Sequence, residues 1–330
     1  MTEATATSLT VAMGWYRSPC RLTLAVATLL AVLAVPGAAG GESADACLAR
    51  LNTVRQRVGS PPVGSLVVAG GRKPLAVAAR NHAAYRARTD AANLRDPSAH
   101  HETRGRPGFT GVLPWDRTRW AGLPAGAWLA QAEDVITGED VSASALAGVR
   151  AWTDAPYHRF PLLDPNMTRA GCAAASWPAP GGHRRSAEVL DMVWPRKPQV
   201  ARIVAYPANG QVRVPTSFDR RTEQPSPFPR ATTPRVGYVV TLQASGWQAM
   251  KVSQLTLHRH GGRPVPAYPA ARYGPSGWVD HNLPGNTAML AAKAPLAPRT
   301  NYRVTVRGHV RAAPTAPWRP FNRSWSFTTA

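Results

Sequence analysis

The sequence predicts a two-part protein, in which an α+β half is followed by an all-β sandwich. Its 330 residues exceed the length of one typical domain, and a hydrophobic share of 44% is enough to build two cores. In the first half apolar residues recur at helical spacing, whereas short alternating segments separated by proline and glycine clusters follow after residue 200. We therefore place the domains at 40–200 and 201–330.

Near the N-terminus, a positively charged stretch precedes an uncharged, mostly apolar run of 14 residues, Leu22 to Val35. At about 1.5 Å per residue this run spans roughly 21 Å as a helix, which is shorter than a bilayer core of about 30 Å. The pattern is typical of a secretory signal peptide, here over residues 1–39. It predicts export and no stable transmembrane span; an uncleaved membrane anchor is the alternative.

Export leaves two cysteines in the mature chain, Cys47 and Cys172, because Cys20 belongs to the signal peptide. An even pair in an oxidising compartment indicates one disulfide, and two separate buried thiols are the alternative. Three cysteines in all exclude a disulfide-dense miniprotein and a four-cysteine zinc site.

The first half begins with predicted helices. Asp45 is a suitable N-cap, and apolar residues follow it at helical spacing until Gly59 ends the pattern. A second helix is expected over 74–88, and a third begins at Ser142.

Other segments predict strands. In the first half two strands form a late hairpin, over 172–177 and 187–194. After residue 200 six alternating segments are typical of a β-sandwich of about 130 residues. They lie at 211–214, 236–242, 254–258, 289–292, 302–307 and 324–328.

Six short motifs of the first half occur in an order that resembles the CAP superfamily, which comprises cysteine-rich secretory, antigen-five and pathogenesis-related proteins. The resemblance covers some 150 residues, from Cys47 to Trp194, and points to the bacterial branch of the family. It implies a three-layer α-β-α sandwich. The motifs are a helix with Asn52 and Arg55, a helix with Asn81 to Tyr85, a loop histidine, an acidic triplet at Glu133, the segment Trp152 to Arg159, and a closing strand that contains a glycine.

In this family a cleft holds two histidines and two acidic residues, which in some members bind a divalent metal such as zinc. Carried over by position, the histidine of the P-x-H-R segment is His158 and the acid of the triplet is Glu133. The loop histidine is His100, with His101 as the alternative. The resemblance therefore implies zinc or another divalent cation as the cofactor of this cleft.

The sequence departs from the family pattern at two places. Asp134 stands beside the triplet glutamate, where the family usually has asparagine. The second acid would fall near Ala155, which has no carboxylate; Asp154 is one position away and Glu139 lies nearby in sequence. The four-residue site is thus incomplete by position.

Two neutral imidazoles and one carboxylate suffice to hold zinc with an open fourth position. The same three groups can perform acid–base work on a bound water. They can also hydrogen-bond one another and only order the loops around them.

The second half resembles bacterial Ig-like domains of secreted and surface proteins. Segments 295–308 and 324–329 match the end of such domains, and Tyr206 to Pro215 fits their first strand. The resemblance implies a spacer or adhesive module without catalytic residues, in which Tyr302 and Trp325 are core or corner aromatics.

The formal net charge of +21 indicates an anionic partner. Residues 201–330 carry most of it, with 17 basic and 3 acidic side chains. Only 4 of the 39 basic residues are lysines, a skew that GC-rich coding also produces. Because export excludes the usual nucleic acids, we expect anionic cell-envelope polymers or lipid head groups as partners.

These observations predict a secreted, non-catalytic binding module at the cell envelope. One alternative is a metal-dependent or acid–base hydrolase that uses His100, Glu133 and His158. A second is a secreted carrier that holds a lipid or sterol in an apolar groove, as some members of the family do.

Overall fold

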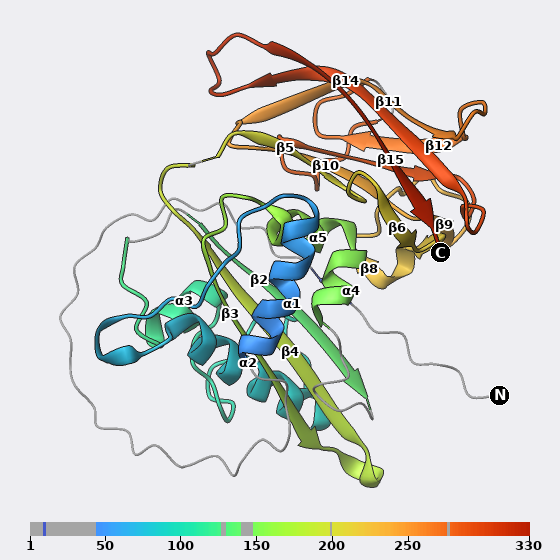
Figure 1. Ribbon diagram of the computed structural model, residues 1–330. Coiled ribbons are helices and arrows are strands. Elements are labelled where there is room, and N and C mark those ends of the chain that lie inside the picture. Colours follow the sequence, from blue (N-terminus) through green and yellow to red (C-terminus); the bar gives the residue numbers. More distant parts are fainter. Residues whose placement is uncertain (1–8, 11–43, 127–129, 140–147, 199, 276–277) are drawn as a thin grey trace.

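The computed structural model describes residues 9–10, 44–126, 130–139, 148–198, 200–275 and 278–330 (Figure 1). A three-stranded sheet organises the first half of the chain, and two four-stranded sheets organise the second. The predicted signal peptide lies outside the described residues, apart from the short strand β1 (Leu9–Thr10), which pairs with β8 (Glu223–Gln224). The predicted helix start at Ser142 also lies outside them.

The first half has more regular elements than the sequence predicts. Both predicted helices near its start and both predicted strands are present, and the unpredicted elements include strand β2, which carries Glu133. The three strands are antiparallel in the order β2-β4-β3. The helices are α1 (Ala44–Arg57), α2 (Pro74–Ala91), α3 (Pro114–Trp120), α4 (Gly148–Asp154) and α5 (Pro156–Leu163), and the strands are β2 (Ala130–Glu139), β3 (Arg169–Pro178) and β4 (Arg184–Trp194).

This sheet lies between two groups of helices. On one face Val135 of β2 packs in a cluster with Ala83 of α2. On the other face its neighbour Ile136 packs in a cluster with Leu51 of α1 and Trp152 of α4. Because successive strand residues point to opposite faces, one strand serves both clusters. The result is the layered arrangement of helices, sheet and helices that the resemblance implies.

Helix α2 approaches β3 closely at Gly171. A Cβ at this position would lie 2.3 Å from backbone atoms of Leu75 and Ala76, so any other residue would push the helix away from the sheet. The glycine of the closing strand motif is therefore required for packing.

The motif formed by Asn52 and Arg55 is also structural. The Asn52 side chain binds both main-chain groups of Val63. Its Oδ1 accepts the Val63 N–H at 2.8 Å, and its Nδ2 donates to the Val63 carbonyl at 2.9 Å. Arg55 is fully buried, and burial lowers its pKa to about 10 despite the nearby Asp164. It stays protonated at neutral pH and ties α1 to the segment after α5. Its guanidinium donates to the carbonyl oxygens of Pro61, Leu162, Asp164 and Met167.

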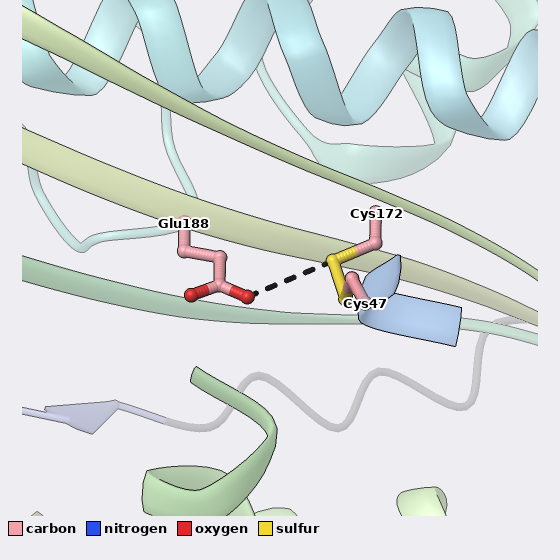
Figure 2. A group of neighbouring side chains, drawn as sticks. All are labelled: Cys47, Cys172 and Glu188. Atoms are coloured by element: carbon pink, nitrogen blue, oxygen red, sulfur yellow. Dashed lines mark hydrogen bonds between the residues drawn. A yellow bond between two sulfur atoms is a disulfide. The ribbon is translucent and has the colours of Figure 1, made fainter. Parts of the chain in front are cut away.

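The predicted disulfide between Cys47 and Cys172 is confirmed (Figure 2). It joins α1 to β3, on the face of the sheet opposite α2. Glu188 of β4 lies beside it, with Oε1 3.8 Å from Cys172 Sγ, and its Oε2 accepts a hydrogen bond from the Gly148 N–H at 2.9 Å. The bridge thus lies in the buried layer between α1, α4 and the sheet.

The second half packs as two facing sheets, with the strand orders β12-β13-β10-β5 and β11-β14-β15-β6. All six predicted segments form strands, but the predicted strand over 236–242 is divided, because β9 pairs with β7 whereas β10 pairs with β5 and β13. Strands β5, β7, β8 and β12 were not predicted. The bounds are β5 (Arg202–Tyr206), β6 (Gln211–Val214), β7 (Ser217–Asp219), β8 (Glu223–Gln224), β9 (Arg235–Gly237), β10 (Val240–Ser245), β11 (Ala249–Arg259), β12 (Ala267–Ala271), β13 (Thr287–Ala292), β14 (Asn301–Arg311) and β15 (Arg319–Thr329).

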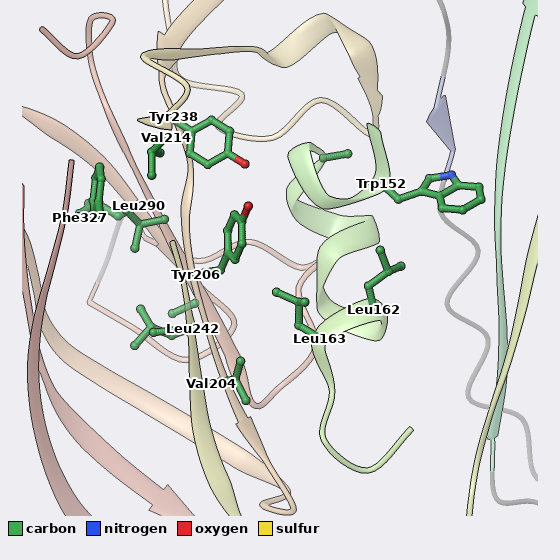
Figure 3. Packing of buried hydrophobic residues seen from close by; sticks show 14 of the residues in the cluster. Trp152, Leu162, Leu163, Val204, Tyr206, Val214, Tyr238, Leu242, Leu290 and Phe327 are labelled. Atoms are coloured by element: carbon green, nitrogen blue, oxygen red, sulfur yellow. The ribbon is translucent and has the colours of Figure 1, made fainter. Parts of the chain in front are cut away.

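The two halves share one hydrophobic core. Leu162 and Leu163 of α5 belong to the same buried cluster as Tyr206 of β5 and Leu242 of β10, and Figure 3 shows α5 against the first sheet of the sandwich. Further into the sandwich, Tyr302 and Trp325 are both buried, as predicted. Tyr302 Oη accepts a hydrogen bond from the Ala297 N–H at 2.9 Å, and Trp325 Nε1 donates to the Pro207 carbonyl at 3.0 Å.

Among the described residues, we find no helix with the length and apolar character needed to span a membrane.

Loss of the disulfide is expected to lower the free energy of unfolding. The bridge links residues 125 positions apart, so the chain-entropy model gives a loss of about 3 to 5 kcal/mol. Urea unfolding of the native protein, with and without a reducing agent, measures this loss. The variant Cys47→Ser/Cys172→Ser should match the reduced native protein and should not respond to reduction. Equal stability of the oxidised and reduced native protein would contradict the expectation.

Candidate functional site

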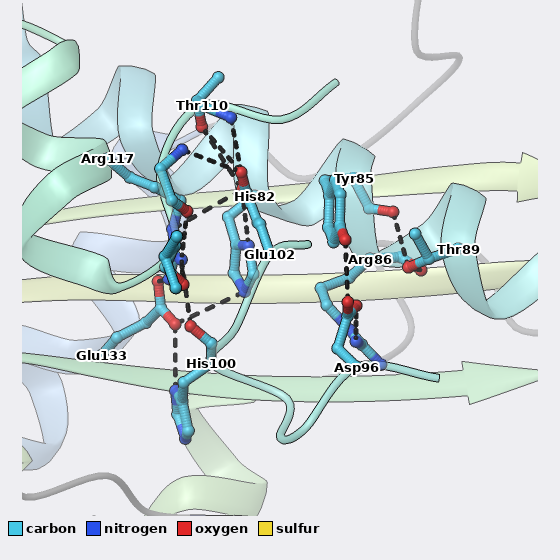
Figure 4. Close-up of polar contacts among 12 residues, drawn as sticks. His82, Tyr85, Arg86, Thr89, Asp96, His100, Glu102, Thr110, Arg117 and Glu133 are labelled. Carbon is cyan, nitrogen blue, oxygen red and sulfur yellow. Dashed lines mark hydrogen bonds and ion pairs between the residues drawn. The ribbon is translucent and has the colours of Figure 1, made fainter. Parts of the chain in front are cut away.

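Glu133 lies at the centre of a buried polar network on the α2 side of the sheet (Figure 4). Its Oε1 is 3.0 Å from His100 Nδ1 and 3.6 Å from His82 Nε2. Its Oε2 accepts a hydrogen bond from Nη2 of Arg117, a residue of α3. The structure therefore brings together two of the residues named by the resemblance, His100 and Glu133, and adds His82 and Arg117 to them.

A second acid, Glu102, fixes the loop that carries His100. Its Oε1 is 3.0 Å from His82 Nδ1, and its Oε2 accepts the main-chain N–H groups of Thr110 at 2.6 Å and Gly111 at 3.2 Å. Arg117 also donates to the His100 carbonyl at 3.0 Å. The main chain around His100 is thus held by charged side chains that are themselves buried.

The pKa values of two acids in this network, Glu133 and Asp191, are shifted in opposite directions. Burial opposes the ionisation of Glu133, but Arg117 and the imidazoles of His82 and His100 together outweigh it and lower its pKa. Asp191 lies directly opposite Glu133 on β4, and burial followed by repulsion from Glu133 raises its pKa well above the ordinary value. The pKa values of this cross-strand pair are thus shifted in opposite directions, as is expected for two close carboxyl groups. A carboxylate with a lowered pKa is a weak general base.

His158 faces an acid from the second half of the chain. Its Nδ1 is 3.0 Å from Oε1 of Glu223, the first residue of β8, and both side chains are fully buried. The same oxygen accepts the main-chain N–H groups of Tyr157 at 2.8 Å and His158 at 3.3 Å. The carboxylate that holds His158 therefore comes from outside the region that resembles the CAP superfamily.

Asp134 lies between the two networks. It follows Glu133 on β2, so its side chain points to the opposite face of the sheet. Burial raises its pKa to about 7, and repulsion from Glu223 and Glu133 adds to this, although His158 and His100 oppose the shift. Its Oδ2 has no hydrogen-bond partner among the described residues.

Three other candidates lie apart from these networks. Asp154 accepts a hydrogen bond from Tyr238 Oη at 2.6 Å, and His101 Nδ1 is 2.6 Å from Ser98 Oγ. Glu139 pairs with Arg185 at 3.0 Å, six residues along β2 from Glu133. Their side-chain contacts therefore place none of them with His100 and Glu133.

The fit of a metal ion can be judged from the donor atoms. Among the described residues, one group of three or more histidine, cysteine or acidic side chains has all its ligand atoms within 4.8 Å of one another, namely Cys47, Cys172 and Glu188. Two of these atoms are the sulfurs of the disulfide. His100, Glu133 and His158 do not form such a group, so in this arrangement they do not fit a zinc site.

Sequence reasoning missed His82, Arg117, Asp191 and Glu223 as members of the site. The first three look like ordinary helix or strand residues until the fold places them around Glu133. Glu223 lies 65 residues after His158, and the one available signal was its rarity, since residues 201–330 contain only 3 acids.

Replacement of Asp134 by asparagine is expected to stabilise the protein in a pH-dependent way. Because the pKa of Asp134 is raised, its contribution to stability is present below its ordinary value of 3.8 and is lost as the pH rises through about 7. The variant does not undergo this loss. The free energy of unfolding of the variant minus that of the native protein should therefore be about 2 to 3 kcal/mol larger at pH 8 than at pH 5. Urea unfolding at the two pH values tests this; a difference that does not change with pH would refute it.

Replacement of Glu223 by alanine is expected to cost about 3 to 5 kcal/mol of unfolding free energy, because it leaves an imidazole and two main-chain N–H groups without their buried acceptor. Asp219→Ala is the matched control, since Asp219 pairs with the exposed Arg221 and should cost about 1 kcal/mol or less. Chemical unfolding of both variants measures the difference. Equal losses would show that the contact between Glu223 and His158 contributes no special stability.

Comparison with known proteins gives one result. Residues 48–182 match the family model described as CAP: Cysteine-rich secretory protein family. No curated protein and no solved structure matches the chain. The matched region includes His100, Glu133 and His158 but ends before Glu223. The match supports the CAP domain that the sequence motifs predict for the first half of this chain.

Proposed function

We propose that this protein is an exported, non-catalytic binding module that is held at the bacterial cell envelope by anionic polymers. In this proposal its second half is an Ig-like domain that supplies the binding surface. The observation that carries the proposal is the outer face of the sheet β11-β14-β15-β6, whose four strands contain no acidic residue. The CAP match and the disulfide support export.

Basic side chains form a row on this face. Arg303 and Arg307 of β14 are exposed and point the same way, and at about 3.3 Å per residue they lie roughly 13 Å apart. His309 follows on the same face, with Lys251 of β11 directly opposite it. Arg303 Nε donates to Ser324 Oγ of β15 at 2.7 Å, which holds the guanidinium along the sheet. Charges spaced along one strand suit an extended polymer.

No nearby acid neutralises this row. The three acids of residues 201–330 are all engaged elsewhere. Asp219 pairs with Arg221 at 2.7 Å, Glu223 is buried against His158, and Asp280 accepts a hydrogen bond from Tyr157 Oη at 2.7 Å. The positive potential of the face is therefore uncompensated within the second half, and it attracts polyanions over about a Debye length.

The polar network of the first half supports binding rather than turnover. His100 and His158 each contact a buried carboxylate, and the pKa of Glu133 is lowered. These contacts stabilise the loops, and the lowered pKa makes Glu133 a weak general base. Binding of a divalent cation is a separate proposal, in which Nε2 would be the donor atom of His158, since its Nδ1 contacts Glu223.

The proposal predicts salt-sensitive binding to isolated cell envelopes. Co-sedimentation should decrease steeply from about 0.05 to about 0.5 M salt. Loss of two exposed cations in Arg303→Ser/Arg307→Ser should weaken binding about tenfold at low salt. Arg57→Ser/Arg80→Ser removes the same charge from exposed positions on α1 and α2 and should bind like the native protein.

Three outcomes would contradict the proposal. Binding that survives high salt would exclude an electrostatic attachment, and equal weakening by both double variants would exclude this particular face. Stronger binding to vesicles of anionic lipid than to lipid-free envelope polymer would replace the polymer by a membrane surface.

A further inference from the structure

A cavity of about 660 Å³ lies where the two halves of the chain meet. Asp164, Asn166 and Trp194 of the first half line one side of it, and Trp247, Arg272 and Tyr273 of the second half line another. Its volume is within the range of small-molecule sites, which is roughly 300 to 1,000 Å³. It is separate from the networks around Glu133 and His158.

Hydrogen bonds between the halves hold this cavity in shape. Asn166, which is buried, donates to the Val200 carbonyl and to Ser245 Oγ, both at 2.8 Å. Asp164 accepts from Ser245 Oγ and, at 3.2 Å, from Gln243 Nε2. Because these contacts join the loop after α5 to β10, the cavity is preformed and needs both halves of the chain.

Aromatic rings supply its apolar walls. Trp194 and Trp247 are half-buried and pack against the shared core, whereas Tyr273 is 43% exposed. The Tyr273 ring packs over Gly285, where a Cβ would lie 3.2 Å from the ring. Half-exposed rings with fixed positions are platforms for a ligand that has an apolar face.

The polar groups of the cavity favour a negatively charged ligand with hydroxyl groups. Arg272 uses Nη1 to bind the His281 carbonyl at 2.6 Å, and its Nε and Nη2 make no hydrogen bond with described residues. Gln248 and Asn286 add amide groups to the lining. Among the described lining residues Asp164 is the only acid, and its two oxygens are already bound to neighbouring residues.

We propose that this cavity binds an acidic saccharide unit of a glycan, with a sugar face stacked on the aromatic walls and the carboxylate paired with Arg272. Sugar rings combine C–H faces with hydroxyl groups, which is the combination that aromatic and amide side chains accommodate together. A guanidinium binds a carboxylate through two parallel hydrogen bonds. The inference rests on the proposed function in one respect, namely that the glycan is part of the envelope polymer. The residues that bind the saccharide are different from those of the basic row.

The test is a titration of the full mature chain with two acidic probes, detected by tryptophan fluorescence and by calorimetry. The probes are a trimer of galacturonic acid and the disaccharide of N-acetylglucosamine and N-acetylmuramic acid. Maltotriose serves as the neutral probe. At least one acidic probe should bind saturably to the native protein. Tyr273→Ala should weaken that binding about three- to tenfold, and Arg272→Gln should weaken acidic probes but not maltotriose.

Two controls separate this inference from the proposed function. Trp120→Ala removes another exposed aromatic ring and should have no effect. Arg303→Ser/Arg307→Ser should retain binding of the short acidic probes even where it loses binding to envelopes. Thermal melts establish that each variant is folded. The inference is overturned if neither acidic probe binds saturably, or if folded Tyr273→Ala and Arg272→Gln variants bind as the native protein does.

Discussion

The arrangement of the whole molecule depends on one buried cation, the guanidinium of Arg159. This residue of α5 is fully buried between the halves, donates to the carbonyls of Thr153, Asp154 and Val239, and lies over the rings of Tyr206 and Tyr238 at 4.6 and 5.2 Å. A buried cation is tolerated only where acceptors surround it, and here they come from both halves of the chain. The position of α5 against the sandwich is thereby fixed, and with it the contact between His158 and Glu223.

Strand β2 links the two buried polar networks of the first half. Strand β2 presents Glu133 to one face of its sheet and Asp134 to the other, so a single strand serves two buried polar networks. On the first face Arg117 lowers the pKa of Glu133, whereas burial and repulsion from Glu133 raise the pKa of Asp191 opposite it. On the second face the charged partner of His158 is Glu223, while Asp134 is raised in pKa. Histidines that are held in this way order the fold around them.

Much of the fold could be predicted from local patterns, because the helices α1 and α2 and the longer strands of the sandwich carry clear periodicity. Strand β2 was missed because both of its faces are buried and its alternation is weak, and α5 was missed because Pro161 interrupts its sequence. The pairing of Cys47 with Cys172 followed from counting cysteines. Glu223 could not be predicted as the partner of His158, since that contact depends on how two halves pack and no local pattern records it.

The shared core prevents the two halves of the chain from moving relative to each other. Domains in one chain move relative to each other unless their interface is large and hydrophobic, and here one buried cluster runs from Cys47 to Phe327 through both halves. The junction is therefore no hinge, and the two halves should unfold in one cooperative transition. The junction cavity and the basic row on β14 then keep a constant separation. A polymer that contacts both must therefore carry its binding groups at a matching distance.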